Sequence, residues 1–148
     1  MTFELLEEAH QHFSEWEMKE KLNLIFTHGW GFEGWFQNEL LVTYLRNGHN
    51  VNILGKVAKD TDIIVDGYGL ELKCWKKDYP SKRKLINAFK QHPNSDGYLF
   101  LLEKDEKTIS ELKKFISNLY IYKMKDISNK YAIMMISKKK ESKVTNDN

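Results

Sequence analysis

The first third of the chain carries the hydrophobic pattern of helices. Over residues 3–22, apolar side chains recur at helical spacing and acidic side chains fill the positions between them. The apolar positions are Leu5, Leu6, Ala9, Phe13 and Trp16. This pattern predicts one amphipathic helix. Residues 28–34 are rich in glycine and predict a break, and a second apolar stripe predicts a helix over 33–47 that ends at Asn47-Gly48.

The pattern then changes to short apolar and β-branched runs, which predict strands at 51–57, 61–65 and 69–75. A helix is expected over 82–91, with Ser81 as its cap, and a buried strand over 97–102. A last helix (108–120, with a capping box at its start) and a last strand (130–137) precede a charged tail at 138–148 that we expect to be frayed.

This order of elements predicts an α/β (α+β) fold with a central mixed β-sheet flanked by helices. A length of 148 residues suits a single domain, here residues 1–148. No apolar run reaches the length of a membrane span, and no signal peptide is recognisable. The single cysteine, Cys74, cannot form an internal disulfide, which favours a cytoplasmic location.

Candidate chemistry lies around Asp66-Gly67, a pair typical of a two-residue hairpin turn. A turn there places Asp62 directly opposite Glu71 on the neighbouring strand. Lys73 projects from the same face because it is two residues beyond Glu71. The other face of the hairpin is apolar and belongs to the core.

Two facing carboxylates repel each other, so without a cation one of the two pKa values should rise. A divalent ion relieves this repulsion, and oxygen ligands suit Mg²⁺, with Mn²⁺ as a substitute. The main-chain carbonyl of Leu72 offers a further oxygen. Lys73 beside such an ion can orient or deprotonate a water molecule, and the ion itself activates that water. The set therefore favours phosphodiester hydrolysis.

Asp62 followed by Glu71-Leu72-Lys73 on the next strand resembles the PD-(D/E)xK, or restriction-endonuclease-like, nuclease superfamily, with some likeness to archaeal Holliday-junction resolvases. The order of elements over residues 33–102 is similar to the common core of that superfamily. The resemblance implies a DNA endonuclease in which Asp62 and Glu71 bind metal and Lys73 is the catalytic lysine. Thr61 stands where the family usually has proline.

Family members often carry another acid on the helix before the strands, and three residues compete for this role. Glu33 and Gln37 lie on the apolar stripe that faces the sheet, whereas Glu39 points toward solvent. The resemblance aligns Gln37 with the usual acid. We therefore expect Glu33 to be the acid and a metal ligand, with Gln37 contacting the metal's water.

Basic side chains after the third strand are candidate phosphate contacts, namely Lys76, Lys77, Lys82 and Arg83. Cleavage of duplex DNA by a chain with one centre favours a homodimer, and the helix at 108–120 is a candidate interface.

Other interpretations remain open. The chain has four Glu-x-Lys triplets, so the triplet at Glu71 could be accidental and Lys73 could simply pair with a surface acid. A non-catalytic nucleic-acid-binding module would have the same fold. Gly29, Gly31 and Gly34 match a dinucleotide-binding pattern after an apolar run at 24–26, although Trp30 and Phe32 crowd that loop.

Overall fold

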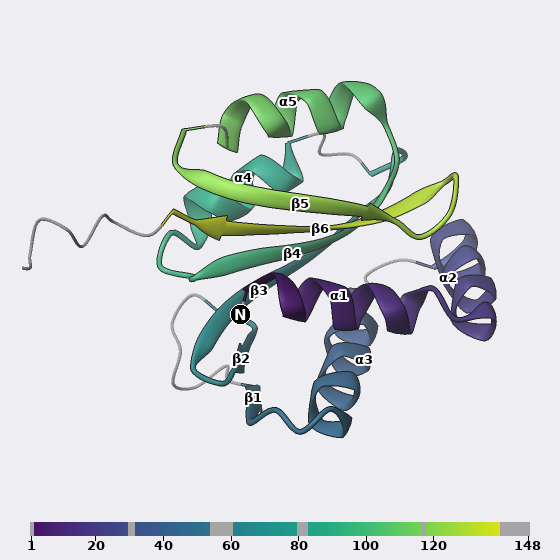
Figure 1. Cartoon of the computed structure of the whole chain (residues 1–148). Coiled ribbons are helices and arrows are strands. Elements are labelled where there is room, and N and C mark those ends of the chain that lie inside the picture. Colours follow the sequence, from purple (N-terminus) through teal and green to yellow (C-terminus); the bar gives the residue numbers. More distant parts are fainter. Residues whose placement is uncertain (1, 30–31, 54–60, 80–82, 117, 140–148) are drawn as a thin grey trace, which may run out of the picture.

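The structure is a computed structural model that describes residues 2–29, 32–53, 61–79, 83–116 and 118–139. The helices within these ranges are α1 (Thr2–Phe13), α2 (Trp16–His28), α3 (Glu33–Arg46), α4 (Lys84–Gln91) and α5 (Glu106–Ile116). The strands are β1 (Val51–Ile53), β2 (Ile63–Val65), β3 (Tyr68–Trp75), β4 (Gly97–Glu103), β5 (Tyr120–Asp126) and β6 (Tyr131–Lys138). Figure 1 shows these elements around one sheet.

The sheet has the strand order β1-β2-β3-β4-β6-β5 and is mixed. β3 and β4 are parallel and are joined by the crossover helix α4, whereas every other neighbouring pair is antiparallel. The α/β fold class with a central mixed sheet is therefore confirmed. Because β3 and β4 are parallel, α4 runs back along the sheet, and its C-terminal end lies near the start of β4.

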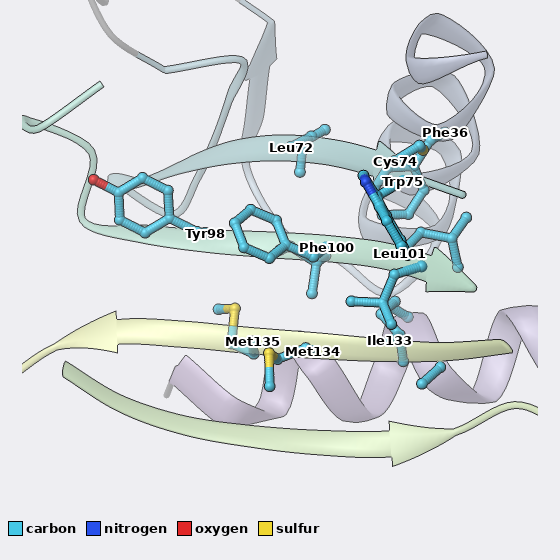
Figure 2. Close-up of a cluster of buried hydrophobic side chains, with 14 of the residues drawn as sticks. Phe36, Leu72, Cys74, Trp75, Tyr98, Phe100, Leu101, Ile133, Met134 and Met135 are labelled. Atoms are coloured by element: carbon cyan, nitrogen blue, oxygen red, sulfur yellow. The ribbon is translucent and has the colours of Figure 1, made fainter. Parts of the chain in front are cut away.

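The core forms on both faces of the sheet. Phe89 of α4 packs against Tyr98 and Phe100 of β4 and against Phe115 of α5, so α4 and α5 cover one face. α1 and α3 cover the other face (Figure 1), and their contact includes Phe13 against Phe36. Figure 2 shows buried side chains of β3, β4 and β6 in this core. β4 and β6 are buried along almost their whole lengths, which agrees with their apolar sequences.

The predicted helix over 3–22 is wrong in one respect, because the structure has two helices there. α1 ends at Phe13, and α2 begins at Trp16 after an extended Glu15 (ψ 145°). Ser14 Oγ lies 3.2 Å from His10 Nε2. Serine readily makes such local bonds in place of continuing a helix. α2 then runs to His28, beyond the predicted end.

β5 was not predicted. The expected helix over 108–120 ends at Ile116, and Tyr120–Asp126 forms the edge strand of the sheet. Its sequence does alternate, since Tyr120, Tyr122 and Met124 lie on one face and lysines follow on the other, and this period of two is typical of a strand. The later part of the predicted strand at 51–57, Ser81 and most of the charged tail lie outside the described residues.

None of the helices in the described part of the chain combines the length and the apolar character needed to cross a membrane.

Candidate active site

The β2–β3 hairpin has the predicted turn and register. Asp66 (φ 49°) and Gly67 (φ 81°) both have positive φ, as a type I′ turn requires. Val65 pairs with Tyr68, and Ile63 pairs with Leu70. The turn is fixed further by Asp66, which accepts a hydrogen bond from the amide of Asn50 at 2.8 Å. The paired part of the hairpin ends at Ile63 and Leu70, so the predicted pairing of Asp62 directly opposite Glu71 is not part of the ladder.

Asp62 lies where the regular β2–β3 ladder stops. Its amide donates to the carbonyl of Leu70 at 3.0 Å, although Leu70 is already the partner of Ile63, and the chain bends there. The carboxylate then substitutes for the next strand residue, because Oδ2 accepts a hydrogen bond from the amide of Leu72 at 2.8 Å. Gln37 of α3 donates to the carbonyl of Asp62 at 2.9 Å and holds this bend.

Glu71 is a buried carboxylic acid with 2% of its surface exposed. Its Oε2 lies 3.6 Å from Lys73 Nζ and 3.3 Å from His92 Nε2. Its Oε1 is also buried, and the described part of the chain offers it no hydrogen-bond donor. Burial, and after it the charge of Asp62, raises the pKa of Glu71 to about 8, while Lys73 opposes the rise. The expected rise of one carboxyl pKa therefore falls on Glu71.

Glu33 occupies the same strand edge one step farther along. Its Oε2 accepts a hydrogen bond from the amide of Cys74 at 3.0 Å and an ion pair from Lys84 Nζ at 2.7 Å. Lys84 also donates to the carbonyl of Cys74 at 3.1 Å. Beyond the end of β2, the open edge of β3 is therefore covered by side chains from α3, α4 and the Asp62 bend.

Leu72 lies between these two carboxylate contacts. In a strand, the amide and the carbonyl of one residue point to the same edge. The Leu72 amide meets Asp62, so the Leu72 carbonyl is directed to the same edge, and Glu33 binds the next amide on that edge. The Leu72 carbonyl is therefore the main-chain oxygen that the sequence predicts as a ligand beside Asp62 and Glu71.

The oxygen atoms of this group are of the kind that bind a divalent cation. Among the residues that the structure describes, no three His, Cys, Asp or Glu side chains converge on a metal position. A cation here would therefore depend on two carboxylates and a carbonyl, completed by water, which is the manner in which Mg²⁺ is commonly held. Two observations support this: Oε1 of Glu71 is buried with no hydrogen-bond partner in the described part of the chain, and the Glu71 carboxyl lies near that of Asp62.

The structure brings together most of the predicted site residues. Asp62, Glu71, Leu72 and Lys73 form one group, and Gln37 and Glu33 contact it through the Asp62 carbonyl and the Cys74 amide. Glu39 is separate from the site, because its Oε1 lies 2.8 Å from His12 Nε2 of α1. Of Glu33, Gln37 and Glu39, only Glu33 and Gln37 therefore contact the strands of the site.

The predicted phosphate contacts differ in their exposure to solvent. Lys76 is buried, with 3% of its surface exposed, and donates to the carbonyls of Phe26 and Gly29 at 3.0 and 3.1 Å. It stabilises the C-terminus of α2, so its prediction as a nucleic-acid contact is wrong in this structure. Lys77 and Arg83 are exposed, and Lys82 lies outside the described residues.

Sequence reasoning missed Lys84 and His92 as members of the site. Lys84 lies in the basic stretch Lys82-Arg83-Lys84, and His92 directly follows α4. Their positions depend on the β3-α4-β4 crossover, which returns both ends of α4 to the edge and face of β3. The local sequence contains no signal for that return.

The dinucleotide-binding interpretation requires a strand before the glycine-rich loop. Residues 24–26 lie instead within α2, and Gly34 lies within α3. Gly31 is outside the described residues. The arrangement of strand, loop and helix that would hold a pyrophosphate is therefore not formed by these residues.

Comparison of the chain with protein-family models, with curated proteins and with solved structures finds no match.

Proposed function

We propose that this protein is a metal-dependent nuclease of the PD-(D/E)xK type that hydrolyses phosphodiester bonds in DNA, as an endonuclease. The observation that carries the proposal is the buried Glu71 carboxyl, whose Oε1 has no hydrogen-bond partner in the described part of the chain, beside Lys73 of the same strand and Asp62 at the bend before β2. A buried acid with a strongly raised pKa beside specific charged partners is typical of a functional site. Burying such a group lowers the stability of the fold. Its presence therefore favours a functional role.

Asp62, Glu71 and the carbonyl of Leu72 would hold Mg²⁺, with Mn²⁺ as an alternative. When bound, the ion would lower the pKa of a coordinated water and polarise the phosphoryl group. These residues supply hard oxygen ligands on a rigid sheet edge. Glu33 was expected to be a further ligand, but its Oε2 already accepts a hydrogen bond from the Cys74 amide and pairs with Lys84.

The residues of the chain have separate tasks in this proposal. Lys73 places an ammonium 3.6 Å from Glu71, where it can position the attacking water and offset charge that develops on the phosphate. His92 fixes the other side of Glu71 when its Nε2 carries the proton, since it then donates toward Oε2 at 3.3 Å. Gln37 fixes the main chain at Asp62. The two carboxylates are thereby held before a ligand arrives.

We propose that the substrate is duplex DNA and that the enzyme acts as a homodimer, since each chain would contribute one centre to one strand. The exposed side chains of Lys77 and Arg83 remain candidates for phosphate contacts. Apolar exposure near β5 is consistent with the expected interface, because Phe115 and Leu119 are 40% and 70% exposed.

The experiment is a cleavage panel with purified protein. Duplex, single-stranded, flapped and four-way DNA and RNA are each incubated with Mg²⁺ or with chelator, and the products are separated on gels. Wild-type protein is compared with Lys73→Ala and Glu71→Gln. The matched control is Lys90→Ala, an exposed lysine at the opposite end of α4 from Lys84.

We expect cleavage of DNA that requires Mg²⁺, is unchanged in Lys90→Ala and is lost in the other two variants while they remain folded. Binding of DNA without cleavage under every metal condition would instead identify a non-catalytic nucleic-acid-binding module. Cleavage that survives in both Lys73→Ala and Glu71→Gln would refute the assignment of the centre.

A further inference from the structure

The ammonium group of Lys84 is enclosed by three different kinds of partner. It lies 2.7 Å from Glu33 Oε2, donates to the Cys74 carbonyl at 3.1 Å and lies 4.8 Å above the centre of the Tyr79 ring. A carboxylate, a carbonyl and an aromatic face together satisfy a cation well. These contacts connect α3, β3 and α4 at the one end of the site where β2 no longer covers β3.

The start of α4 is a costly place for this lysine. Lys84 is the first residue of the helix, the first turn contains no acidic residue, and the preceding Arg83 makes no side-chain capping bond. The positive end of the helix dipole lies at the N-terminus, so a cation there is unfavourable. When a chain breaks a local rule in this way, the reason often lies in a functional site that the residue serves.

Glu33 needs a partner of this kind. Its charge lies close enough to contribute to the raised pKa of Glu71, and it belongs to the same acidic group as Asp62. Without a counter-ion, three carboxylates would repel an approaching phosphate. Lys84 offsets one of these charges and holds its carboxylate on the Cys74 amide, next to the strand edge that carries the Leu72 carbonyl.

We propose that Lys84 is a positioning residue of the active site, which acts through Glu33 and does not itself bind the substrate. Lys84 neutralises Glu33 and fixes it as a clamp on β3, so that Glu33 sets the position of the metal-binding edge without ligating the metal. This inference rests on the proposed nuclease function. The neighbouring Arg83 does not share the role of Lys84, because its side chain is exposed.

The test is a double-mutant cycle in the full-length protein, with kcat and KM for DNA cleavage as readouts. The variants are Lys84→Met, Glu33→Gln, their combination, Lys84→Arg as the conservative replacement and Lys90→Met as the control on the same helix. Thermal unfolding followed by circular dichroism checks that each variant is folded. Mn²⁺ binding to each protein is measured by calorimetry in the absence of DNA.

Lys84→Met should lower kcat by about 10-fold or more with KM changed less than about 3-fold, because an unpaired Glu33 then disturbs the centre. Adding Glu33→Gln should restore kcat to within about 3-fold of the Glu33→Gln single variant, since the charge that needed Lys84 is gone. Lys84→Arg should retain most of the activity. Glu33→Gln should keep Mn²⁺ affinity, because a glutamine oxygen can still accept from the Cys74 amide.

Two results would overturn the inference. One is a double variant that is as impaired as Lys84→Met, which would mean that Lys84 contacts the substrate. The other is a Glu33→Gln variant that loses Mn²⁺ binding, which would make Glu33 a ligand. If Lys84→Met does not fold, the double variant is compared with Glu33→Gln alone, and unequal kcat values would overturn it. Failure of the nuclease proposal differs, because wild-type protein would then cleave nothing.

Discussion

Asp62 Oδ2 accepts a hydrogen bond from the amide of Leu72 at 2.8 Å, so a side chain takes the position where the next residue of strand β2 would bond. This contact holds the carboxylate at the strand edge next to Glu71. The bend at Asp62 therefore places a carboxylate at the candidate metal site.

Asp62→Asn tests this contact. An asparagine oxygen can still accept from Leu72, so we expect the free energy of unfolding to change by less than about 1 kcal/mol. Cleavage should fall by at least about 100-fold, since a neutral amide is a poor ligand for Mg²⁺. Denaturant unfolding and the cleavage assay measure the two effects. Asp62→Ala provides the comparison, because it also removes the hydrogen bond and should be less stable than Asp62→Asn.

Glu71→Gln should stabilise the metal-free protein at alkaline pH. The pKa of Glu71 is raised from 4.5 to about 8, so the folded state holds its proton more tightly than the unfolded state. The contribution of Glu71 to stability is then greatest below pH 4.5 and declines as the pH rises toward 8. At pH 8 in chelator, we expect Glu71→Gln to be more stable by on the order of 2–4 kcal/mol.

The measurement is thermal unfolding between pH 5 and pH 9, with and without Mg²⁺. Addition of Mg²⁺ should raise the Tm of wild-type protein at pH 8 and leave that of Glu71→Gln nearly unchanged. Equal pH profiles of Tm for the two proteins in chelator would show that the pKa of Glu71 is not raised in the folded state.

The predictability of this molecule from sequence depended on how local each signal was. The Asp66-Gly67 turn is a local signal, and with it came the register that pairs residues 63–65 with residues 68–70. The bend that ends this register at Asp62 had no local signal. The break between α1 and α2 was hidden because the apolar stripe continues through Trp16, a residue that is 75% exposed in the structure. A stripe of this kind does not reveal where a helix turns away from the core.

The missed parts of the site depend on contacts between distant segments. His92 reaches Glu71 from 21 positions along the chain, and Lys84 reaches Glu33 across α3 and β3. Lys76 lies beside Lys77 in sequence, yet it is directed inward to the end of α2. Only the folded arrangement distinguishes a buried helix cap from an exposed basic side chain.

Lys76→Met should therefore act on stability and not on DNA binding. The variant leaves the carbonyls of Phe26 and Gly29 without their charged donor, and we expect a loss of about 1–3 kcal/mol of unfolding free energy. The salt dependence of DNA affinity should stay the same. Arg83→Ala should show the reverse, with a salt slope reduced by roughly one phosphate contact and an unchanged Tm. An altered salt slope in Lys76→Met would show that Lys76 reaches DNA.

His49 provides a pH-dependent contact at the tip of the hairpin. Its Nδ1 lies 2.6 Å from Asp66 Oδ2 and its Nε2 lies 2.8 Å from Glu8 Oε2 of α1, and these partners raise the pKa of His49. A raised histidine pKa stabilises the fold fully below about pH 6.5, and this stabilisation is lost as the pH rises through the raised value. Wild-type protein should exceed His49→Asn in Tm by a few degrees at pH 6.

That difference in Tm should shrink as the pH rises toward 9. A constant difference between the two proteins from pH 5 to pH 9 would show that His49 is not charged in the folded state.

On the acid side, the main-chain bond from Asn50, followed by His49, lowers the pKa of Asp66. Its contribution is therefore present above about pH 3.9 and is lost as the pH falls through the lowered value.

The most direct test of the proposed centre is the position of a bound cation. Crystals grown with Mn²⁺ give an anomalous difference map that locates the metal independently of any enzymatic assay. We expect one peak per chain within about 2.5 Å of carboxylate oxygens of both Asp62 and Glu71 and of the Leu72 carbonyl, and no such peak in Glu71→Gln. A map with no peak between these residues at saturating Mn²⁺, or a peak held elsewhere in the chain, would contradict the metal-dependent nuclease.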